Sequence, residues 1–184
     1  TRDDAAGECF DKVARILGLD YPGGPIVEKL AKEQIKFSKK FDIKLPRPML
    51  NTNDFDFSFS GLKTAVLYDY KKRESGVRRS KSYVREMCAE TQNAIFDVLI
   101  KKTLNAAKQY NAKTIILGGG VSASQSLKEI LNAKIKKEMP QTQFLAPKKE
   151  LSTDNGAMIA MTAFFYKDKN FVPEDFVANS RIKL

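Results

Sequence analysis

The chain has 184 residues, 42% of them hydrophobic and 29% charged, which suffices for one globular domain or two small lobes with a buried core. Lysine and arginine number 32 against 22 acidic residues. The resulting net charge of +10 permits contact with nucleic acid, although solvated basic faces would give the same balance. The absence of histidine excludes a Ser-His or Cys-His catalytic pair and a histidine-rich metal site within this sequence.

The cysteines and the hydropathy pattern indicate a cytoplasmic setting. Cys9 and Cys88 lie far apart, so nothing suggests a disulfide framework or a zinc site, and a reducing cytoplasm is expected. No apolar run approaches the ~20 residues of a membrane span and no signal peptide is visible, so no membrane partner is expected. The sequence starts at Thr1 and enters a predicted helix almost at once, as expected for a fragment or a processed product.

The first predicted element is an amphipathic helix over residues 3–17. Its apolar side chains recur at helical spacing, and Asp3 or Asp4 is the expected cap. Asp11 lies at the edge of the apolar stripe. Periodicity alone therefore favours a solvated surface carboxylate at this position.

A turn and a second helix follow. Residues 21–25 (YPGGP) predict the turn, with Gly24 as the expected N-cap and Pro25 at the first helical position. The Gly24 N–H would then lie at a helix N-terminus, with Glu28 one turn further in. A turn requires such glycines in any case, so the local signal is weak.

Alternating aromatic residues predict a short strand over residues 55–59, followed by a helix that Ser60 caps. Lys63 would be exposed near the start of this helix, where a positive charge opposes the helix dipole. The lysine is therefore either present for a partner or an ordinary solvated side chain.

A basic loop is predicted over residues 71–81, before a long helix over residues 82–110 with a broad apolar face that we interpret as core. Arg78, Arg79 and Lys81 make this loop the best local candidate for contact with a phosphate backbone. A solvated loop between two helices is the alternative.

Residues 112–161 predict two extended runs that each end in a small polar loop and a helix. The first strand, residues 114–117, leads through Gly118, Gly119 and Gly120 to a helix over residues 124–138. Helix N-termini favour anions, and glycines allow a ligand close to the backbone. The same glycines would also suit an ordinary turn between a strand and a helix.

The second extended run, residues 143–145, precedes a helix over residues 154–166 that is rich in alanine and methionine and suits packing against a sheet. Asp154 lies at or beside the N-cap of this helix, and capping is the ordinary role of such a residue. We therefore expect three parts: residues 1–111, mainly helical; residues 112–166, strand-helix-strand-helix; and residues 167–184, a weakly patterned tail.

Five strings stand in a specific order along the chain. They are residues 3–12 (DDAAGECFDK), 21–25 (YPGGP), 57–64 (FSFSGLKT), 118–123 (GGGVSA) and 152–158 (STDNGAM). Each is weak alone, but together they closely resemble the TsaD family, the transferase subunit for the threonylcarbamoyl modification of tRNA. The resemblance covers nearly the whole chain and only the C-terminal part of that family.

The resemblance implies an α/β fold of the actin/Hsp70-like (ASKHA, RNase H-like) class with two lobes and a nucleotide in the cleft. This chain would be the helix-rich C-terminal lobe with an incomplete sheet. The implied reaction moves threonylcarbamoyl from threonylcarbamoyl-AMP to the tRNA adenosine next to the anticodon, and the fragment alone is expected to be inactive. Implied partners are tRNA, a paralogous partner subunit and a small ATPase. A non-catalytic nucleotide-binding subunit and an actin-like ATPase or kinase are the alternatives.

The resemblance also implies roles for individual residues. Nucleotide contacts would come from Asp11, Gly24, Glu28, Gly119, Gly120 and Ser124. Ser124 stands where the family usually has Asn, and a hydroxyl lacks the paired donor and acceptor of an amide. Asp154 matches a metal-binding aspartate, for iron by resemblance or alternatively zinc, and the other family ligands belong to an upstream HxxxH motif that is absent here. The expected nucleic-acid contacts are Lys63, Arg78, Arg79 and Lys81.

Overall fold

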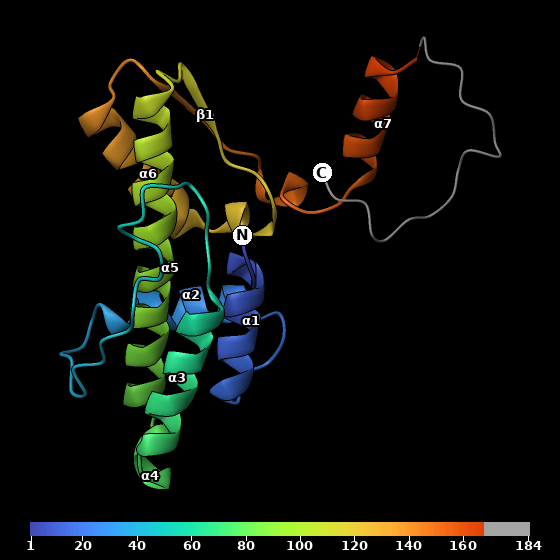
Figure 1. Ribbon diagram of the computed structural model, residues 1–184. Helices are drawn as coiled ribbons and strands as arrows, with labels where there is room; N and C mark the ends of the chain where they lie inside the picture. Colours follow the sequence, from blue (N-terminus) through green and yellow to red (C-terminus); the bar gives the residue numbers. More distant parts are fainter. Residues whose placement is uncertain (168–184) are drawn as a thin grey trace. The chain divides into compact units, whose positions relative to one another are not determined.

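The computed structural model describes residues 1–167, so the predicted tail lies outside the described residues except for Lys167. The chain divides into two compact units, Thr1–Ser152 and Thr153–Leu184 (Figure 1). Within residues 1–167, no helix combines the length and apolarity that a membrane crossing requires.

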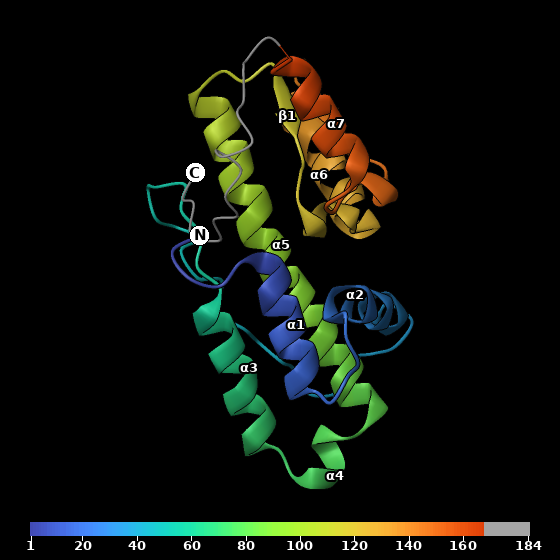
Figure 2. The same ribbon diagram turned by 90° about the vertical axis from the view of Figure 1, so that its right-hand side faces the viewer.

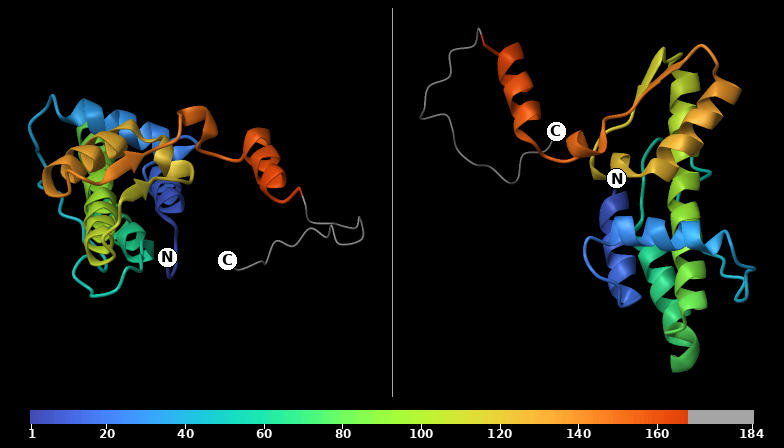
Figure 3. Two further views of the ribbon diagram at one scale, coloured as in Figure 1. Left: turned by 90° about the horizontal axis from the view of Figure 1, so that it is seen from above. Right: turned by 180° about the vertical axis from the view of Figure 1, so that it is seen from behind.

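The first unit is organised around one long helix, α5 (Lys81–Gln109), which has 29 residues. The other helices of this unit are α1 (Ala6–Ile16), α2 (Gly23–Gln34), α3 (Ser60–Lys72), α4 (Ser75–Arg78) and α6 (Gln125–Glu138). All five contact α5. Figure 2 shows α1 and α3 beside one part of α5, and Figure 3 shows α2 crossing it.

A small parallel sheet is present in the same unit. Strand β1 (Thr114–Ile116) pairs with β2 (Gln143–Leu145), with Thr114 opposite Gln143 and Ile116 opposite Leu145. The 3-10 turn η1 (Gly120–Ala123) and helix α6 connect the two strands. Residues 1–167 therefore form a helix-rich α/β structure with a two-stranded sheet, which agrees with the predicted α/β class, and the two-lobe actin/Hsp70-like fold stays a prediction.

The core lies between α1, α2, α3 and α5. Phe10 of α1 meets Phe96 of α5 edge to face, with ring centroids 6.3 Å apart. Helix α2 approaches α1 closely because residue 23 is a glycine. A Cβ at Gly23 would lie 2.5 Å from the Cβ of Ala14 and 2.9 Å from the Cα of Asp11.

Buried charged side chains on α5 hold the loops of residues 35–54. The Glu86 carboxylate accepts backbone N–H groups from Lys40 at 2.8 Å, Phe41 at 3.2 Å and Ile43 at 3.4 Å. One turn later, Glu90 accepts the Leu45 N–H at 3.2 Å. These segments have no regular partner strand, so the carboxylates satisfy backbone donors that burial would otherwise leave unpaired.

The predicted strand over residues 55–59 does not form. Phe59 is buried and stacks on Phe57, with ring centroids 6.3 Å apart. The carbonyl of Phe57 accepts the Arg2 N–H at 2.8 Å, and the Phe59 N–H donates to Asp3 at 2.8 Å. The N-terminal segment therefore satisfies backbone groups that a strand partner would otherwise pair.

Three predicted helix caps are also wrong. The N-cap of α1 is Ala5, without a side-chain hydrogen bond, because the Asp3 carboxylate is occupied at the start of α3. Pro22 rather than Gly24 is the N-cap of α2, and Phe59 rather than Ser60 is the N-cap of α3. Ser124, predicted as the first residue of the helix over residues 124–138, is the N-cap of α6.

The predicted basic loop over residues 71–81 is not a continuous loop. It contains the last two residues of α3, the whole of α4 and the first residue of α5. The guanidinium of Arg78 lies 5.3 Å from the ring centroid of Tyr70, and Asp69 accepts the Tyr83 hydroxyl at 2.8 Å. Packing between α3, α4 and α5 thus orders part of this segment.

The second unit contains helix α7 (Gly156–Phe165). Asn155 caps it by accepting the Met158 N–H at 2.9 Å. The capping role considered for Asp154 therefore belongs to its neighbour. Large apolar side chains of α7, including Ile159 and Phe164, are exposed, and their expected packing against a sheet stays a prediction.

Candidate nucleotide site

Asp11 is placed at the start of α2. It projects from α1, is half-buried, and its Oδ1 accepts the N–H of Gly23 at 2.8 Å. The first residues of a helix carry N–H groups without intrahelical acceptors, so Asp11 satisfies one of them. Gly24 comes next and has no heavy atom within 4 Å of the position that a Cβ would occupy.

Glu28 connects α2 to the start of α6. Its Oε1 accepts the Ser126 N–H at 2.9 Å and lies 3.3 Å from the Lys32 Nζ. Burial acts to raise the pKa of Glu28, but the hydrogen bonds from Ser126 and the charge of Lys32 outweigh it and lower the pKa below its ordinary value. Glu28 is therefore an ionised carboxylate at neutral pH, between two helices far apart in sequence.

The glycine loop leads into the same region. Gly119 has a φ of +77°, a left-handed conformation that glycine adopts without a steric penalty. The turn η1 then ends at Ser124, whose Oγ accepts the Leu127 N–H at 3.2 Å. The Ser124 hydroxyl hydrogen is still free to donate, because capping uses only an oxygen lone pair.

These contacts bring most of the sequence-predicted nucleotide residues together. Asp11 binds the N–H of Gly23, which precedes Gly24, and Glu28 binds the N–H of Ser126, two residues after Ser124. A Cβ at Gly7 of α1 would lie 3.4 Å from a methyl of Val121 in η1, so α1 also packs against the glycine loop. The chain therefore forms one polar region from the N-termini of α2 and α6, with one carboxylate at each.

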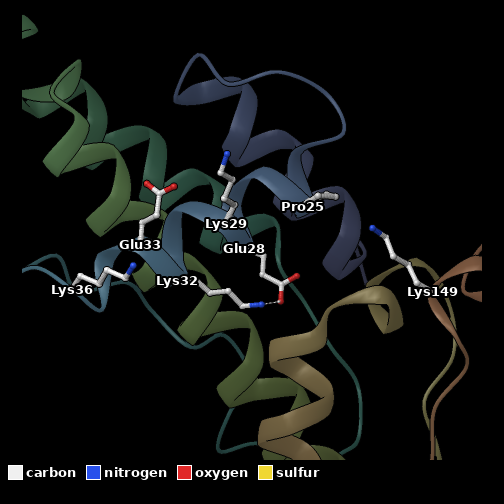
Figure 4. A pocket seen from close by; sticks show the side chains of 7 residues that line it. All are labelled: Pro25, Glu28, Lys29, Lys32, Glu33, Lys36 and Lys149. Carbon is white, nitrogen blue, oxygen red and sulfur yellow. Dashed lines mark ion pairs between the residues drawn. The ribbon is translucent and has the colours of Figure 1, made fainter.

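The chemistry of this region suits hydroxyl groups. Carboxylates are acceptors only and take hydrogen bonds from sugar hydroxyls, whereas a phosphate beside either one would be repelled. The open backbone at Gly24 and the remaining donor of Ser124 suit acceptor atoms of a ligand. A hollow of about 470 Å³ adjoins Glu28, lined by Pro25, Glu28, Lys29, Lys32, Glu33, Lys36 and Lys149 (Figure 4).

Asp154 belongs to the second unit, just before α7. Its side chain is exposed and has no partner within the described part of the chain. No group of three or more Cys, Asp or Glu residues that could hold a metal ion occurs among residues 1–167. Asp154 can thus supply one metal ligand, and the described residues do not complete a metal centre.

The predicted nucleic-acid residues differ in exposure. The prediction that Lys63 is exposed is wrong, because it is half-buried in the first turn of α3, and Arg78 is half-buried against Tyr70. Arg79 and Lys81 are exposed. Figures 1 and 2 show α4 at one end of α5, whereas α6 lies along the other end of α5.

Sequence reasoning missed two contributors to this site. Ser126 pairs with Glu28, and Gly23 allows the α1–α2 contact. The glycine pair at 23 and 24 was a visible signal, although periodicity could not tell which glycine packs and which stays open. Ser126 carried no signal, because its contact spans 98 residues.

Comparison with known proteins decides the family. Residues 1–161 match the model of the TsaD family, described as tRNA N6-adenosine threonylcarbamoyltransferase. The chain belongs to this family. The resemblance read from the five strings is thereby confirmed.

Three TsaD relatives carry the name tRNA N6-adenosine threonylcarbamoyltransferase. The protein from Syntrophomonas wolfei is 44% identical over 174 residues, covering 94% of this chain and 49% of the relative. The protein from Variovorax paradoxus is 48% identical over 163 residues, covering 89% and 44%. The protein from Persephonella marina is 42% identical over 189 residues, covering 100% and 51%. The chain thus spans about half the length of the curated TsaD relatives it matches.

Proposed function

We propose that this chain forms the nucleotide-binding lobe of an enzyme that transfers threonylcarbamoyl from threonylcarbamoyl-AMP to the tRNA adenosine next to the anticodon. The observation that carries the proposal is the family match over residues 1–161. The shared geometry of Asp11 and Glu28 at two helix N-termini supports it. The proposed complete enzyme has an actin/Hsp70-like fold with an upstream lobe, which would correspond to the unmatched half of the relatives.

Asp11 and Glu28 would accept hydrogen bonds from the ribose hydroxyls of the adenylate. The Ser124 hydroxyl would donate to the ligand, in place of the amide found at this position in the family. Gly119 and Gly120 would let the ligand approach the backbone, because no Cβ stands in the way. The chain's contribution is therefore to hold and orient the acyl-adenylate.

In the transfer step, the exocyclic amine nitrogen of adenosine forms a bond to the carbamoyl carbon. The bond from that carbon to the phosphate oxygen breaks, AMP leaves with the electron pair, and the amine loses a proton to water. The leaving AMP gains negative charge, and we assign its stabilisation to no residue of this chain, because the Glu28 carboxylate already lies at the N-terminus of α6.

We further propose that Asp154 gives one carboxylate ligand to a divalent metal, iron or zinc, whose other ligands come from outside this sequence. A single exposed aspartate does not bind such an ion by itself, so we assign no step to the metal. The proposed setting is the cytoplasm, with a paralogous partner subunit and a small ATPase. The free carboxylate of Asp154 within residues 152–156 favours an enzyme over a non-catalytic binding subunit.

The direct test uses the full-length gene product with threonylcarbamoyl-AMP and unmodified tRNA. Nucleoside mass spectrometry should detect threonylcarbamoyladenosine, and a reaction without protein measures the background. Steady-state ATP hydrolysis with and without tRNA tests the alternative of an actin-like ATPase or kinase. ATP turnover that needs no tRNA, together with unmodified nucleosides, would contradict the proposed transfer.

A further inference from the structure

Helix α2 and the turn that follows it carry three exposed lysines. Lys29 and Lys32 are three residues apart on one side of α2, and Lys36 lies two residues beyond the end of the helix at Gln34. Lys149, in the short turn η2 (Lys149–Leu151), lines the same hollow (Figure 4). These four residues, all exposed, are called the lysine face below.

Most of this charge is uncompensated. Lys32 lies 3.3 Å from Glu28, but that carboxylate also accepts the Ser126 N–H. The other three members of the lysine face have no acidic partner within residues 1–167. Glu33 also lines the hollow, so four lysines and two glutamates leave a net charge of +2 there. Clustered positive charge lowers helix stability slightly, and a concave wall concentrates its field. This arrangement suits an anionic partner.

The length of the lysine face favours a polymer over a single phosphate. The backbones of Lys29 and Lys36 lie roughly 10 Å apart along about two turns of chain, so the two side chains can each contact a separate phosphate. A nucleic-acid backbone presents successive phosphates over such a distance. The hollow also adjoins Glu28, at the candidate nucleotide site.

We propose that the lysine face binds the phosphate backbone of RNA and guides it toward the nucleotide site. The inference rests on the proposed function, in which the RNA is the tRNA substrate. It differs from the sequence-based expectation, because Arg78 in the segment of residues 71–81 is engaged with Tyr70.

The test compares two triple variants of the full-length gene product that change the charge equally. One is Lys29→Gln/Lys36→Gln/Lys149→Gln, which removes the three unpaired members of the lysine face. The control is Lys113→Gln/Lys134→Gln/Lys136→Gln, at exposed positions before β1 and on α6. The affinity for an unmodified tRNA transcript is measured by fluorescence anisotropy between about 50 and 200 mM KCl. Over this range, the affinity of a protein that contacts several phosphates changes by orders of magnitude.

Each phosphate contact contributes about 0.7 to 0.9 to the magnitude of the slope of log K against log salt. The slope of the first variant should therefore be smaller in magnitude by about 2 to 3. The control should keep the slope of the unsubstituted protein. Equal slopes for the first variant and the unsubstituted protein would overturn the inference and leave the proposed function untouched. Failure of the unsubstituted protein to bind tRNA would contradict the proposed function itself, and this inference with it.

Calorimetric titration with AMP distinguishes a lysine face that binds the phosphate of the nucleotide from one that binds the phosphate backbone of RNA. The lysine-face variant should bind AMP as the unsubstituted protein does, which also shows that its site is folded. Loss of AMP affinity with an unchanged tRNA slope would assign the lysines to the nucleotide phosphate and overturn the inference.

Discussion

At the scale of single residues, Asp3 has a larger structural role than its place near the N-terminus suggests. Its two oxygens accept the N–H groups of Phe59 and Ser60 and the hydroxyls of Ser58 and Ser60. Burial acts to raise the pKa of Asp3, but these four hydrogen bonds outweigh it and hold the pKa well below its ordinary value. Asp3 therefore acts as a cap for α3 from a distant part of the chain.

Asp3→Ala should lower the free energy of unfolding by about 1 kcal/mol at pH 7, the usual effect of losing a helix cap. Because the folded-state pKa is lowered, this contribution is complete above the unfolded-state pKa of about 3.9 and declines as the pH falls toward the folded-state value. Urea unfolding at pH 7 and pH 3 should show a smaller difference at pH 3. Asp20→Ala, at an exposed position, is the control, and equal effects of both changes would refute the capping role.

The two neighbouring glycines of α2 should respond differently to the same change. Gly23→Ala places a Cβ 2.9 Å from backbone atoms of α1 and should cost about 1 to 3 kcal/mol of unfolding free energy. Gly24→Ala meets open space, so its stability should be unchanged or slightly higher, while the affinity for AMP should fall if the ligand approaches there. Thermal unfolding and calorimetry measure both quantities. A stable Gly23→Ala protein would contradict the close packing.

At the scale of elements, α5 positions segments that have little regular structure of their own. Glu86 accepts three backbone N–H groups from residues 40–43, and Lys102 donates to Thr52 at 2.8 Å and to Asp54 at 2.9 Å. The apolar side chains of such a helix pack in the core, while its buried charged side chains bind the irregular segment. The irregular segment therefore depends on α5 for its conformation.

Glu86→Ala should leave these amides without their acceptor and free the segment around residue 41. Each unsatisfied buried donor lowers the free energy of unfolding by up to about 3 kcal/mol. Amide hydrogen exchange at Lys40 and Phe41 should become much faster. Glu129→Ala, at an exposed position of α6, is the control. Unchanged protection of both amides would show that other contacts hold the loop.

The role in tRNA binding that the sequence predicts for residues 71–81 stays a prediction, and it can be tested independently of the lysine face. Neutralising Arg79 and Lys81 to Gln removes two exposed charges, whereas changing Arg78 would also disturb its stacking on Tyr70. If both contact phosphates, the salt slope of tRNA binding by the full-length gene product should fall by about 1.4 to 1.8. An unchanged slope would make the segment an ordinary solvated surface.

At the scale of the whole molecule, the chain contains one part of a proposed site and one candidate metal ligand. Family membership is shown over residues 1–161, and the chain spans about half of its relatives' length. The polar region between α2 and α6 is formed entirely within the first unit. Nucleotide orientation and metal binding can therefore be tested by separate variants.

Asp154→Ala in the full-length gene product should abolish metal-dependent transfer and lower the metal content measured by mass spectrometry. Its unfolding temperature should stay nearly constant, because the exposed carboxylate has no partner among the residues described. Asn155→Ala is the matched control: it removes the α7 cap, at about 1 kcal/mol, and should spare the metal content. Full metal content in the Asp154 variant would remove this residue from the ligand set.

Sequence patterns predicted the elements with strong periodicity. They failed where contacts between residues far apart in the sequence determine the local structure. The long helix and the two short strands follow local rules, and the structure has them, whereas their parallel pairing and the Ser124 cap emerge only in the structure. The alternation over residues 55–59 looked like a strand, but Asp3 and Arg2 take its backbone partners. Local rules place Asp11 on a surface, whereas its contact with Gly23 depends on how α1 and α2 pack. The family resemblance supplied what periodicity could not, because it carries information on tertiary neighbours.

Gly23 also bears on how this sequence can evolve. A side chain at that position would meet the Cβ of Ala14, which a second change to glycine could remove, but also the Asp11 Cα and the Phe10 carbonyl oxygen at 2.9 Å. Those are main-chain atoms that every amino acid retains. A genetic screen for suppressors of Gly23→Ala should therefore recover reversion to glycine, and no compensating replacement within α1.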